Sequence, residues 1–273
     1  MCGRYVMARA TSDLVALGDA ETNEELVLRQ SWNVAPTAEV PILVAHADDV
    51  GAGVTRRIHV ARWGLVPPWA KELSVGSRAF NARSETVASK PTFRAAVRAR
   101  RCAVPVEGYY EWKTPEPGAK GPDGRAAKKQ PYYVHPAGAG DGEGPVIWFA
   151  GLYEWWQDPE AKAAGEDAWV LSTTILTMAA PDADDDDPVL AALGQLHDRL
   201  PVPMDAETMD RWLAPDTLGS AEEADALVGQ VCAGAYDVAA GWSLRPVGGA
   251  VGNVRNNGPE LIQEMREQQG TLL

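Results

Sequence analysis

The feature that most restricts the fold of this chain is a succession of short apolar runs with few long helical segments between them. Gly, Pro or charged residues bound each run, as is typical of strands. Because strands follow strands more often than they alternate with helices, we predict an α+β fold with a barrel-like, mainly antiparallel β core and peripheral helices. The predicted strands are Val40–Ala45, Ile58–Trp63, Cys102–Trp112, Gln130–Val134, Val146–Trp155 and Trp169–Leu176. The predicted helices are Thr11–Leu17, Thr92–Arg100, Pro188–Leu193, Ala206–Leu213, Ala221–Ala233 and Pro259–Gln269.

The domain organisation is predicted from length and composition. A chain of 273 residues can bury a full hydrophobic core, and no long flexible linker divides this one. We therefore predict a single domain over residues 1–273. Two segments have the composition of surface insertions: the Pro-, Gly- and Lys-rich stretch 114–129 and the acidic stretch 181–187.

The charge of the chain is unevenly distributed. The formal net charge is −13, which by itself argues against a nucleic-acid partner, because phosphate binding favours a basic surface. Residues 56–130, however, carry 16 Lys and Arg against 6 Asp and Glu, a net charge of +10. A net-acidic chain with one basic stretch can still present a basic groove. We therefore expect a basic groove on an acidic body.

Cysteine usage and hydropathy bear on the compartment. No apolar run approaches the roughly 18 to 20 residues needed to cross a bilayer, and the N-terminus lacks the apolar stretch of a secretion signal. Cys2, Cys102 and Cys232 lie far apart and form no CxxC pair, so neither a disulfide framework nor a zinc site is indicated. We expect a cytoplasmic protein that makes no membrane contact.

Cys2 is the first candidate for chemistry. Removal of Met1 would leave Cys2 at the N-terminus, with an amine and a thiol on adjacent carbons. Such a 1,2-aminothiol forms a Schiff base with an aldehyde through its amine, and attack of the thiol then closes a thiazolidine ring. By position alone, many chains begin with Met-Cys without such a function. Cys102 lies in an apolar strand and Cys232 in a helical pattern, which indicates core residues.

Two types of acid/base group are candidates. His197 follows a predicted helix and is flanked by Asp and Leu, in a position that suits a residue that transfers protons. Glu111 lies in the run Gly108-Tyr-Tyr-Glu-Trp112, and Glu154 lies in the similar run Gly151-Leu-Tyr-Glu-Trp155. The residues alone do not choose between these two carboxylates. The repetition favours two related strands of one barrel.

Two further segments suit binding. Asn81 and Arg83 are two residues apart, so on an extended segment they point to the same side, where they could bind a phosphate or polarise a carbonyl. Trp63 and Trp69 flank a Pro-Pro turn and could stack on unpaired bases, although core packing explains a tryptophan equally well.

Taken together, these segments resemble a known family. Their order along the chain is Met1-Cys-Gly-Arg-Tyr5, Trp32-Asn-Val-Ala-Pro-Thr37, Trp63-Gly-Leu-Val-Pro-Pro-Trp69, Asn81-Ala-Arg-Ser-Glu85, Arg101-Cys-Ala-Val-Pro105, Gly108-Tyr-Tyr-Glu-Trp112, Phe149-Ala-Gly-Leu-Tyr-Glu-Trp155, Ile175-Leu-Thr177 and His197-Asp-Arg-Leu-Pro201. This series is similar to the SRAP family, over Cys2 to about Leu213. The resemblance implies a domain with a barrel-like antiparallel core. It also implies binding of single-stranded DNA at abasic sites and covalent linkage to the ring-opened deoxyribose aldehyde, which shields the lesion during DNA repair or the SOS response.

The resemblance also assigns residue roles. It implies that Cys2 is the crosslinking residue, that Asn81 contacts the opened sugar and that Arg83 binds phosphate. It implies an acid/base role for Glu111, in preference to Glu154, and a role for His197 in ring opening and Schiff-base formation.

Other implied roles are less specific. Arg4, Trp69 and Thr177 align with positions that contact DNA or line the site. No metal or organic cofactor is implied, and we expect a monomer whose partner is single-stranded DNA containing abasic sites. The acidic stretch after Thr177 departs from the family pattern near His197, and the long basic loop 114–129 is expected to extend or gate the DNA groove.

Two other hypotheses stay open. In the first, the protein is a cysteine peptidase in which His197 activates the Cys2 thiol, acting on its own N-terminus or on another chain. In the second, it is a non-catalytic binder of single strands that uses its tryptophans and its basic segment.

Overall fold

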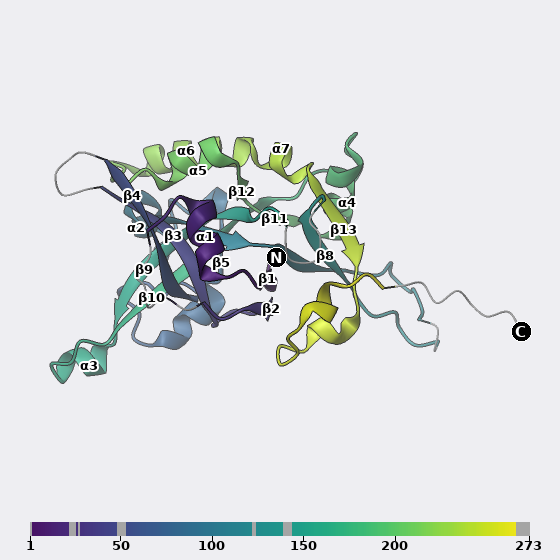
Figure 1. The fold of residues 1–273 in the computed structure, drawn as a ribbon, viewed down its shortest axis with the longest axis horizontal. Helices are drawn as coiled ribbons and strands as arrows, with labels where there is room; N and C mark the ends of the chain where they lie inside the picture. The colour runs from purple at the N-terminus through teal and green to yellow at the C-terminus, as the bar shows by residue number, and fades with distance from the viewer. Residues whose placement is uncertain are drawn as a thin grey trace, which may run out of the picture.

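Five strands close into a β-barrel, which forms the centre of the molecule (Figure 1). The computed structural model describes residues 2–21, 26, 28–47, 53–121, 124–138 and 144–265. The barrel consists of β3 (Glu39–Ala47), β4 (Val54–Trp63), β6 (Arg101–Val106), β9 (Ile147–Gln157) and β10 (Trp169–Ala179). β10 pairs in parallel with β4 and antiparallel with β9, and the other neighbours in the ring are antiparallel.

Short strands extend the barrel where the candidate residues lie. β5 (Asn81–Arg83) pairs in parallel with β10, and β11 (Arg199–Pro201) pairs antiparallel with the same strand. β12 (Pro203–Met204) pairs with β9. β10 therefore has a backbone partner along nearly its whole length. The buried hydroxyls of Ser172 and Thr173 also bond to β9, since they donate to the carbonyls of Glu154 (3.2 Å) and Leu152 (2.9 Å).

A second, five-stranded antiparallel sheet lies beside the barrel. Its order is β13 (Trp242–Pro246), β8 (Gln130–Pro136), β7 (Gly108–Lys113), β1 (Tyr5–Met7) and β2 (Ser31–Val34). Alternate residues of its strands face different clusters: Tyr5 and Tyr109 join the main core, whereas Val6, Tyr110 and Tyr133 form a smaller cluster on the other face.

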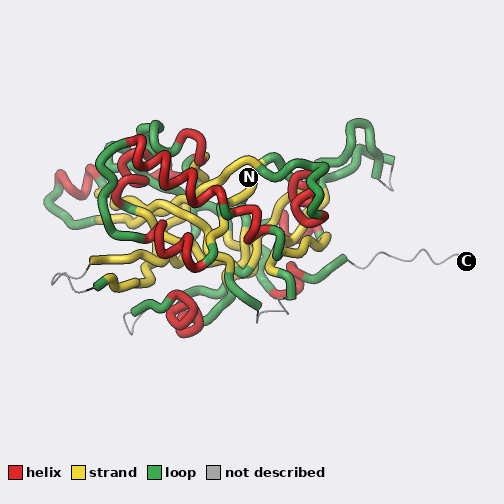
Figure 2. The backbone as a smooth tube through the Cα atoms, turned by 90° about the horizontal axis from the view of Figure 1, so that it is seen from above, coloured by secondary structure: helices red, strands yellow, loops and turns green. Residues whose placement is uncertain are grey.

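Helices cover the outside of the two sheets. α5 (Ala206–Leu213), α6 (Ala221–Ala233) and α7 (Ala235–Ala239) lie together along one side (Figure 1), and the view from above shows helices over the strands (Figure 2). α2 (Arg94–Ala99) packs on α6 and β9, α4 (Pro188–Leu196) packs on β7 and β13, and α1 (Thr11–Gly18) packs on β4. The remaining helical segments are α3 (Pro159–Ala163) and the 3₁₀ turns η1 (Leu73–Arg78), η2 (Ser84–Thr86), η3 (Gly249–Gly252) and η4 (Pro259–Ile262). Within the described part of the chain, no helix is both long and apolar enough to span a membrane.

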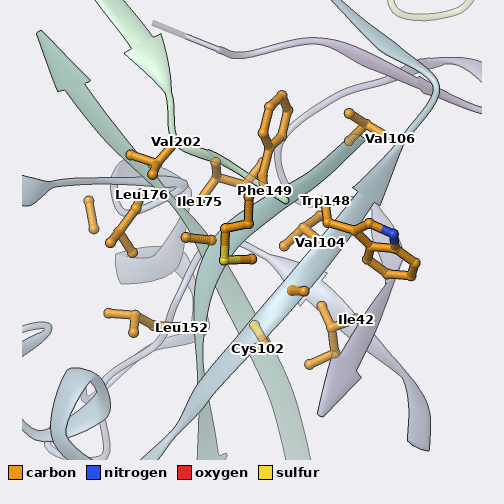
Figure 3. Packing of buried hydrophobic residues seen from close by; sticks show 14 of the residues in the cluster. Ile42, Cys102, Val104, Val106, Trp148, Phe149, Leu152, Ile175, Leu176 and Val202 are labelled. Carbon is orange, nitrogen blue, oxygen red and sulfur yellow. The ribbon is translucent and has the colours of Figure 1, made fainter. Parts of the chain in front are cut away.

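The main core fills the barrel and the space under α5. Figure 3 shows Ile42, Val104, Leu152 and Ile175 packed together with other buried apolar residues. Trp212 of α5 is fully buried, and its indole N–H donates to the carbonyl oxygens of Cys102 (3.0 Å) and Gly151 (3.3 Å). Because the only polar atom of this large side chain is bonded to the barrel backbone, α5 is fixed on β6 and β9.

The structure confirms the predicted α+β class with a barrel-like, mainly antiparallel core and peripheral helices. The predicted strand Cys102–Trp112 is wrong, because the chain breaks at Glu107 into β6 and β7, which belong to different sheets. A carboxylate oxygen of Glu107 accepts the backbone N–H of Ala8 (2.5 Å), which stabilises the bend. The two similar Glu-containing runs are accordingly not strands of one barrel: β7 lies in the five-stranded sheet and β9 in the barrel.

Three predicted helices also differ from the structure. The helix predicted as Pro188–Leu193 extends to Leu196, where the N–H of His197 still bonds to the carbonyl of Leu193 (3.2 Å). The helix predicted from Thr92 begins at Arg94, because the carbonyl of Lys90 first closes a turn with the N–H of Phe93 (3.0 Å). The segment predicted as the helix Pro259–Gln269 contains only η4, after which Met265 donates its N–H to the carbonyl of Pro246 (2.9 Å). Its residues from 266 onward lie outside the described residues.

The segment between β4 and β5 requires two glycines. Gly64 has φ +130°, and a Cβ there would lie 2.4 Å from the carbonyl oxygen of Gly76. A Cβ on Gly76 would lie 2.3 Å from the carbonyl oxygen of Gly64. The two backbones can approach this closely only without side chains, and the N–H of Leu65 then reaches the carbonyl of Ala79 (3.1 Å).

We predict that Gly64→Ala lowers the free energy of unfolding by about 2 kcal/mol or more, since it adds both backbone strain and overlap. The matched control is Gly229→Ala in α6, where nothing lies within 4 Å of the added Cβ. This substitution should stabilise the helix by roughly 0.5–1 kcal/mol. Urea unfolding of both variants checks the prediction, and equal midpoints would contradict it.

Candidate active site

Cys2 and Asn81 meet where the five-stranded sheet approaches the barrel. Cys2 precedes β1, and Asn81 is the first residue of β5, opposite Ile175 of β10. The side-chain amide of Asn81 donates to the carbonyl oxygen of Cys2 (2.7 Å). The side-chain oxygen of Asn81 is buried and has no hydrogen-bond partner among the described residues. It is therefore an acceptor available to a ligand hydroxyl or amine beside Cys2.

The Cys2 thiol lies in an apolar and acidic environment. Cys2 is fully buried and belongs to the main core. Burial raises the pKa of the Cys2 thiol far above its ordinary value, and the nearby charge of Glu111 raises it further. The pKa of the Tyr109 hydroxyl is raised by the same burial, by Glu111 and by Cys2. These couplings identify Cys2, Tyr109 and Glu111 as neighbours, and they favour a protonated thiol at neutral pH.

The structure distinguishes the two carboxylates that the sequence left as alternatives. Glu111 lies on β7, is buried, and interacts electrostatically with Cys2. Glu154 lies on β9 and is engaged elsewhere: its carboxylate accepts from the guanidinium of Arg100 (2.7 Å) and from the N–H of Trp155 (3.0 Å). The electrostatic influence on the thiol therefore associates Glu111 with Cys2, whereas the Glu154 carboxylate is paired with Arg100.

β10 aligns a second group of polar residues. Thr177 is fully buried and lies opposite Arg83 of β5 on one side and Pro201 of β11 on the other. The guanidinium of Arg199 donates to the carbonyl oxygen of Thr177 (2.6 Å) and forms a two-pronged ion pair with Glu85 (2.5 and 2.9 Å). Glu85 thus fixes Arg199 beside Thr177, while Arg83 is exposed.

His197 directly follows α4 as its C-cap, next to this group. Its Nδ1 accepts the backbone N–H of Arg199 (2.9 Å) and lies 2.7 Å from a carboxylate oxygen of Asp198. The first contact suits a neutral ring protonated on Nε2, and the second suits a protonated ring that donates from Nδ1. Both contacts involve Nδ1 and hold the orientation of the ring. α4 packs on β7, the strand of Glu111.

Arg4 is largely committed to contacts within the protein. Its guanidinium donates to the side chain of Asn33 (2.8 Å) and to the carbonyl of Val251 (2.8 Å), and it lies 5.9 Å from the ring centroid of Trp112. Partial burial lowers the pKa of Arg4. Asn33 in turn donates to the carbonyl of Asn256 (2.9 Å), so Arg4 and Asn33 together attach the C-terminal loops to β2.

The two tryptophans around the Pro-Pro turn have different environments. Trp63 is fully buried and donates its indole N–H to the carbonyl of Phe80 (2.9 Å), so it is a core residue. Trp69 is 60% exposed and therefore presents an aromatic face to solvent. A groove of about 680 Å³ runs beside Asn81, and its lining includes the cations Arg78 and Lys90.

Several of these residues escaped prediction from the sequence. Arg199 and Glu85 lie within motifs that the sequence identified, but their pairing joins positions 114 residues apart and carries no local signal. Arg78 and Lys90 belong to the basic segment 56–130, whose charge excess was the only indication of a groove. Within the described residues, no cluster of three His, Cys, Asp or Glu side chains could hold a metal ion.

Comparison with known proteins identifies the relatives of this chain. Residues 1–254 match the model of the family described as SOS response associated peptidase (SRAP). The chain is 30% identical over 264 residues to the abasic site processing protein YoqW of Bacillus subtilis (strain 168), which covers 96% of this chain and 99% of the relative. It is 27% identical over 258 residues to the abasic site processing protein HMCES of Rattus norvegicus, over 85% of this chain and 64% of that protein.

A solved structure has the same fold. The X-ray structure of a protein from Bacteroides thetaiotaomicron aligns with a TM-score of 0.69 at 20% identity, covering 97% of this chain and all of that one. At this identity the likeness bears on the fold alone.

The raised pKa of the Cys2 thiol leads to a test of its reactivity. Because the thiolate is the nucleophile and Cys2 is fully buried, native Cys2 should react with iodoacetamide at pH 8 at least about 100-fold more slowly than in the unfolded chain. Peptide mass spectrometry after timed alkylation measures both rates. Cys232, which is half-buried, provides the internal comparison. Equal rates for native and unfolded Cys2 would contradict the inferred environment.

Proposed function

The chain belongs to the SOS response associated peptidase (SRAP) family, and we propose that it binds single-stranded DNA and crosslinks to abasic sites through Cys2. The relatives named as abasic site processing proteins supply the class of substrate. The observation that carries the proposal is the joint position of Cys2, Asn81 and Glu111. The Asn81 amide bonds to the carbonyl of Cys2, the Asn81 oxygen has no partner among the described residues, and the charge of Glu111 acts on the Cys2 thiol.

The proposed chemistry needs no cofactor. Once Met1 is removed, the α-amine of Cys2 attacks the C1′ aldehyde of the ring-opened deoxyribose, and loss of water gives an imine. The thiol sulfur then adds to the imine carbon, and the thiol proton passes to the imine nitrogen. The product is a thiazolidine, in which a carbon–nitrogen and a carbon–sulfur bond hold one carbon. One water molecule is released overall.

The neighbouring residues suit the proton transfers of this sequence. The electrostatic coupling of Glu111 to Cys2 supports a role in which Glu111 accepts the proton from the attacking amine or from the thiol. The two partners of the His197 Nδ1 atom support a role for this ring in protonating the sugar oxygen during ring opening. The unpartnered oxygen of Asn81 suits a hydroxyl of the opened sugar.

Binding of the DNA strand is proposed for the surrounding cations and for Trp69. Arg83 is exposed at the end of β5, and Arg78 and Lys90 line the groove beside Asn81. Phosphate contacts from these side chains would offset the repulsion from the net-negative body of the protein. Trp69, with most of its surface in solvent, suits stacking on an unpaired base. Thr177, whose carbonyl accepts from Arg199, is proposed to line the site. For Arg4, whose guanidinium donates to Asn33, we propose a role in holding the surrounding loops instead of a direct contact with DNA.

The two other hypotheses receive less support. A cysteine peptidase needs a thiolate of lowered pKa, whereas burial and Glu111 raise the pKa of the Cys2 thiol. A purely non-catalytic binder gives no reason for a buried carboxylate whose charge acts on the buried Cys2 thiol. We therefore favour crosslinking, which starts from the amine and uses the thiol second. Intact-mass measurement of the purified protein tests the first condition, the removal of Met1.

We predict that Cys2→Ala abolishes a heat-stable adduct with single-stranded DNA that contains one abasic site. Cys2→Ser should form only an imine, since a hydroxyl is a weaker nucleophile, and this imine should become stable only after borohydride reduction. Denaturing gel electrophoresis with end-labelled DNA measures both. Cys232→Ala, which leaves the N-terminus intact, is the matched control. An undiminished heat-stable adduct in Cys2→Ala would refute the proposed mechanism.

We predict that Glu111→Gln and His197→Gln each slow adduct formation about 100-fold or more, as is usual when a general acid or base is removed. Both substitutions keep size and hydrogen-bonding capacity. Glu154→Gln is the control, because that carboxylate pairs with Arg100. The measurement is the single-turnover rate at saturating DNA. A Glu154 variant that is slowed as much as the Glu111 variant would show that the carboxylate has been assigned wrongly.

A further inference from the structure

The strands β7 and β8 continue beyond the sheet as an exposed hairpin. Their last paired residues are Lys113 and Gln130. Beyond them, Ala127 donates its N–H to the carbonyl of Ala119 (3.0 Å), and Gly121 donates to the carbonyl of Arg125 (2.8 Å). The two segments therefore still face each other well outside the sheet. We call the described residues 113–121 and 124–129 the basic arm; the loop that leads into β8 is visible in Figure 1.

The basic arm has a strongly positive composition in an otherwise acidic chain. Over residues 113–129 the sequence has five Lys and Arg against two acids, Glu116 and Asp123. Its cations are all exposed and are Lys113, Lys120, Arg125, Lys128 and Lys129. By contrast, the whole chain has a formal net charge of −13. A cationic ribbon on an acidic body attracts polyanions to one place and repels them elsewhere.

The basic arm begins next to the candidate active site. Side chains alternate along a strand, so Tyr109, Glu111 and Lys113 lie on the same face of β7. This is the face on which Tyr109 joins the main core together with Cys2. At about 3.3 Å per residue, Lys113 follows Glu111 by roughly 7 Å. The arm then leads away from the sheet, so its cations start within about two residues of Glu111 and extend outward from there.

We propose that the basic arm binds the phosphate backbone of the DNA strand beside its abasic nucleotide. This inference rests on the proposed function and adds a second contact region to it. Exposed lysines and arginines contact phosphates without reading sequence, which matches a protein that must act wherever a base is lost. The acidic body would then limit binding outside the groove and the arm, so that the DNA reaches Cys2 in one orientation.

The test compares two variants that lose the same charge. The arm variant combines three substitutions in the basic arm, Lys113→Gln, Lys128→Gln and Lys129→Gln. The control variant combines three substitutions outside the arm and the site, Arg57→Gln, Lys162→Gln and Arg211→Gln. The probe is a fluorescent 21-nucleotide single strand without an abasic site, titrated by anisotropy between 50 and 200 mM salt. Thermal unfolding of each variant verifies that it is folded.

If each of the three lysines contacts one phosphate, the slope of log Kd against log salt should fall by about 2, because a single-strand contact contributes roughly 0.7. Kd at 50 mM salt should rise at least tenfold for the arm variant, with the control slope unchanged. Equal changes in both variants would mean that only bulk charge matters and would overturn the proposal. An unchanged arm variant would overturn it as well.

The experiments distinguish an error in the proposal for the basic arm from an error in the proposed crosslinking function. The arm assay uses intact DNA and does not depend on chemistry at Cys2. With abasic DNA at saturation, the arm variant should reach the wild-type yield of adduct, while its rate at low DNA concentration falls in proportion to Kd. Absence of any wild-type adduct would refute crosslinking without affecting the anisotropy result.

Discussion

The backbone pairing of β10 is the constraint on which both the barrel and the site depend. β10 closes the barrel through β4 and β9, and the end of the same strand binds β5 on one side and β11 on the other. This pairing sets Thr177 opposite both Arg83 and Pro201. Asn81, two residues before Arg83, is thereby held where its amide reaches the carbonyl of Cys2 (2.7 Å). One strand thus pairs with four others, β4, β5, β9 and β11, which are far apart in the sequence.

The architecture could be predicted from the sequence where periodicity is strong and local. The barrel strands β3, β4, β9 and β10 each contain a predicted apolar run, and α5 and α6 have the predicted bounds. The prediction failed at Glu107, where the chain bends between two equally apolar strands. The bend is stabilised by a bond from the N–H of Ala8, which is distant in sequence, to the Glu107 carboxylate, so the local sequence does not indicate it. The C-terminal helix failed for a related reason, since the chain there pairs with the end of β13 instead of forming helical bonds.

The sequence predicted which motifs belong to the candidate site, but it did not predict which of their residues contact one another. Motif order indicated Cys2, Asn81 and Glu111 through a family resemblance, whereas the residues alone left Glu111 and Glu154 as equals. The structure distinguishes the two carboxylates by their partners, since Glu154 forms an ion pair with Arg100. Arg199 had no assigned role, because its ion pair with Glu85 depends on tertiary structure. Roles for the single residues of the site stay predictions until their variants are measured.

The environment of Cys2 imposes an order on the proposed reaction. A thiol whose pKa is raised by burial and by Glu111 is a poor first nucleophile at neutral pH. An N-terminal amine, with an ordinary pKa near 7.7 to 8, is partly neutral there and can attack an aldehyde. Imine formation then creates an electrophilic carbon next to the thiol, and the proposed role of Glu111, whose charge acts on the Cys2 thiol, is to accept the thiol proton at this step. The burial that argues against a peptidase therefore suits a thiol that acts second, on a carbon already bound by the amine.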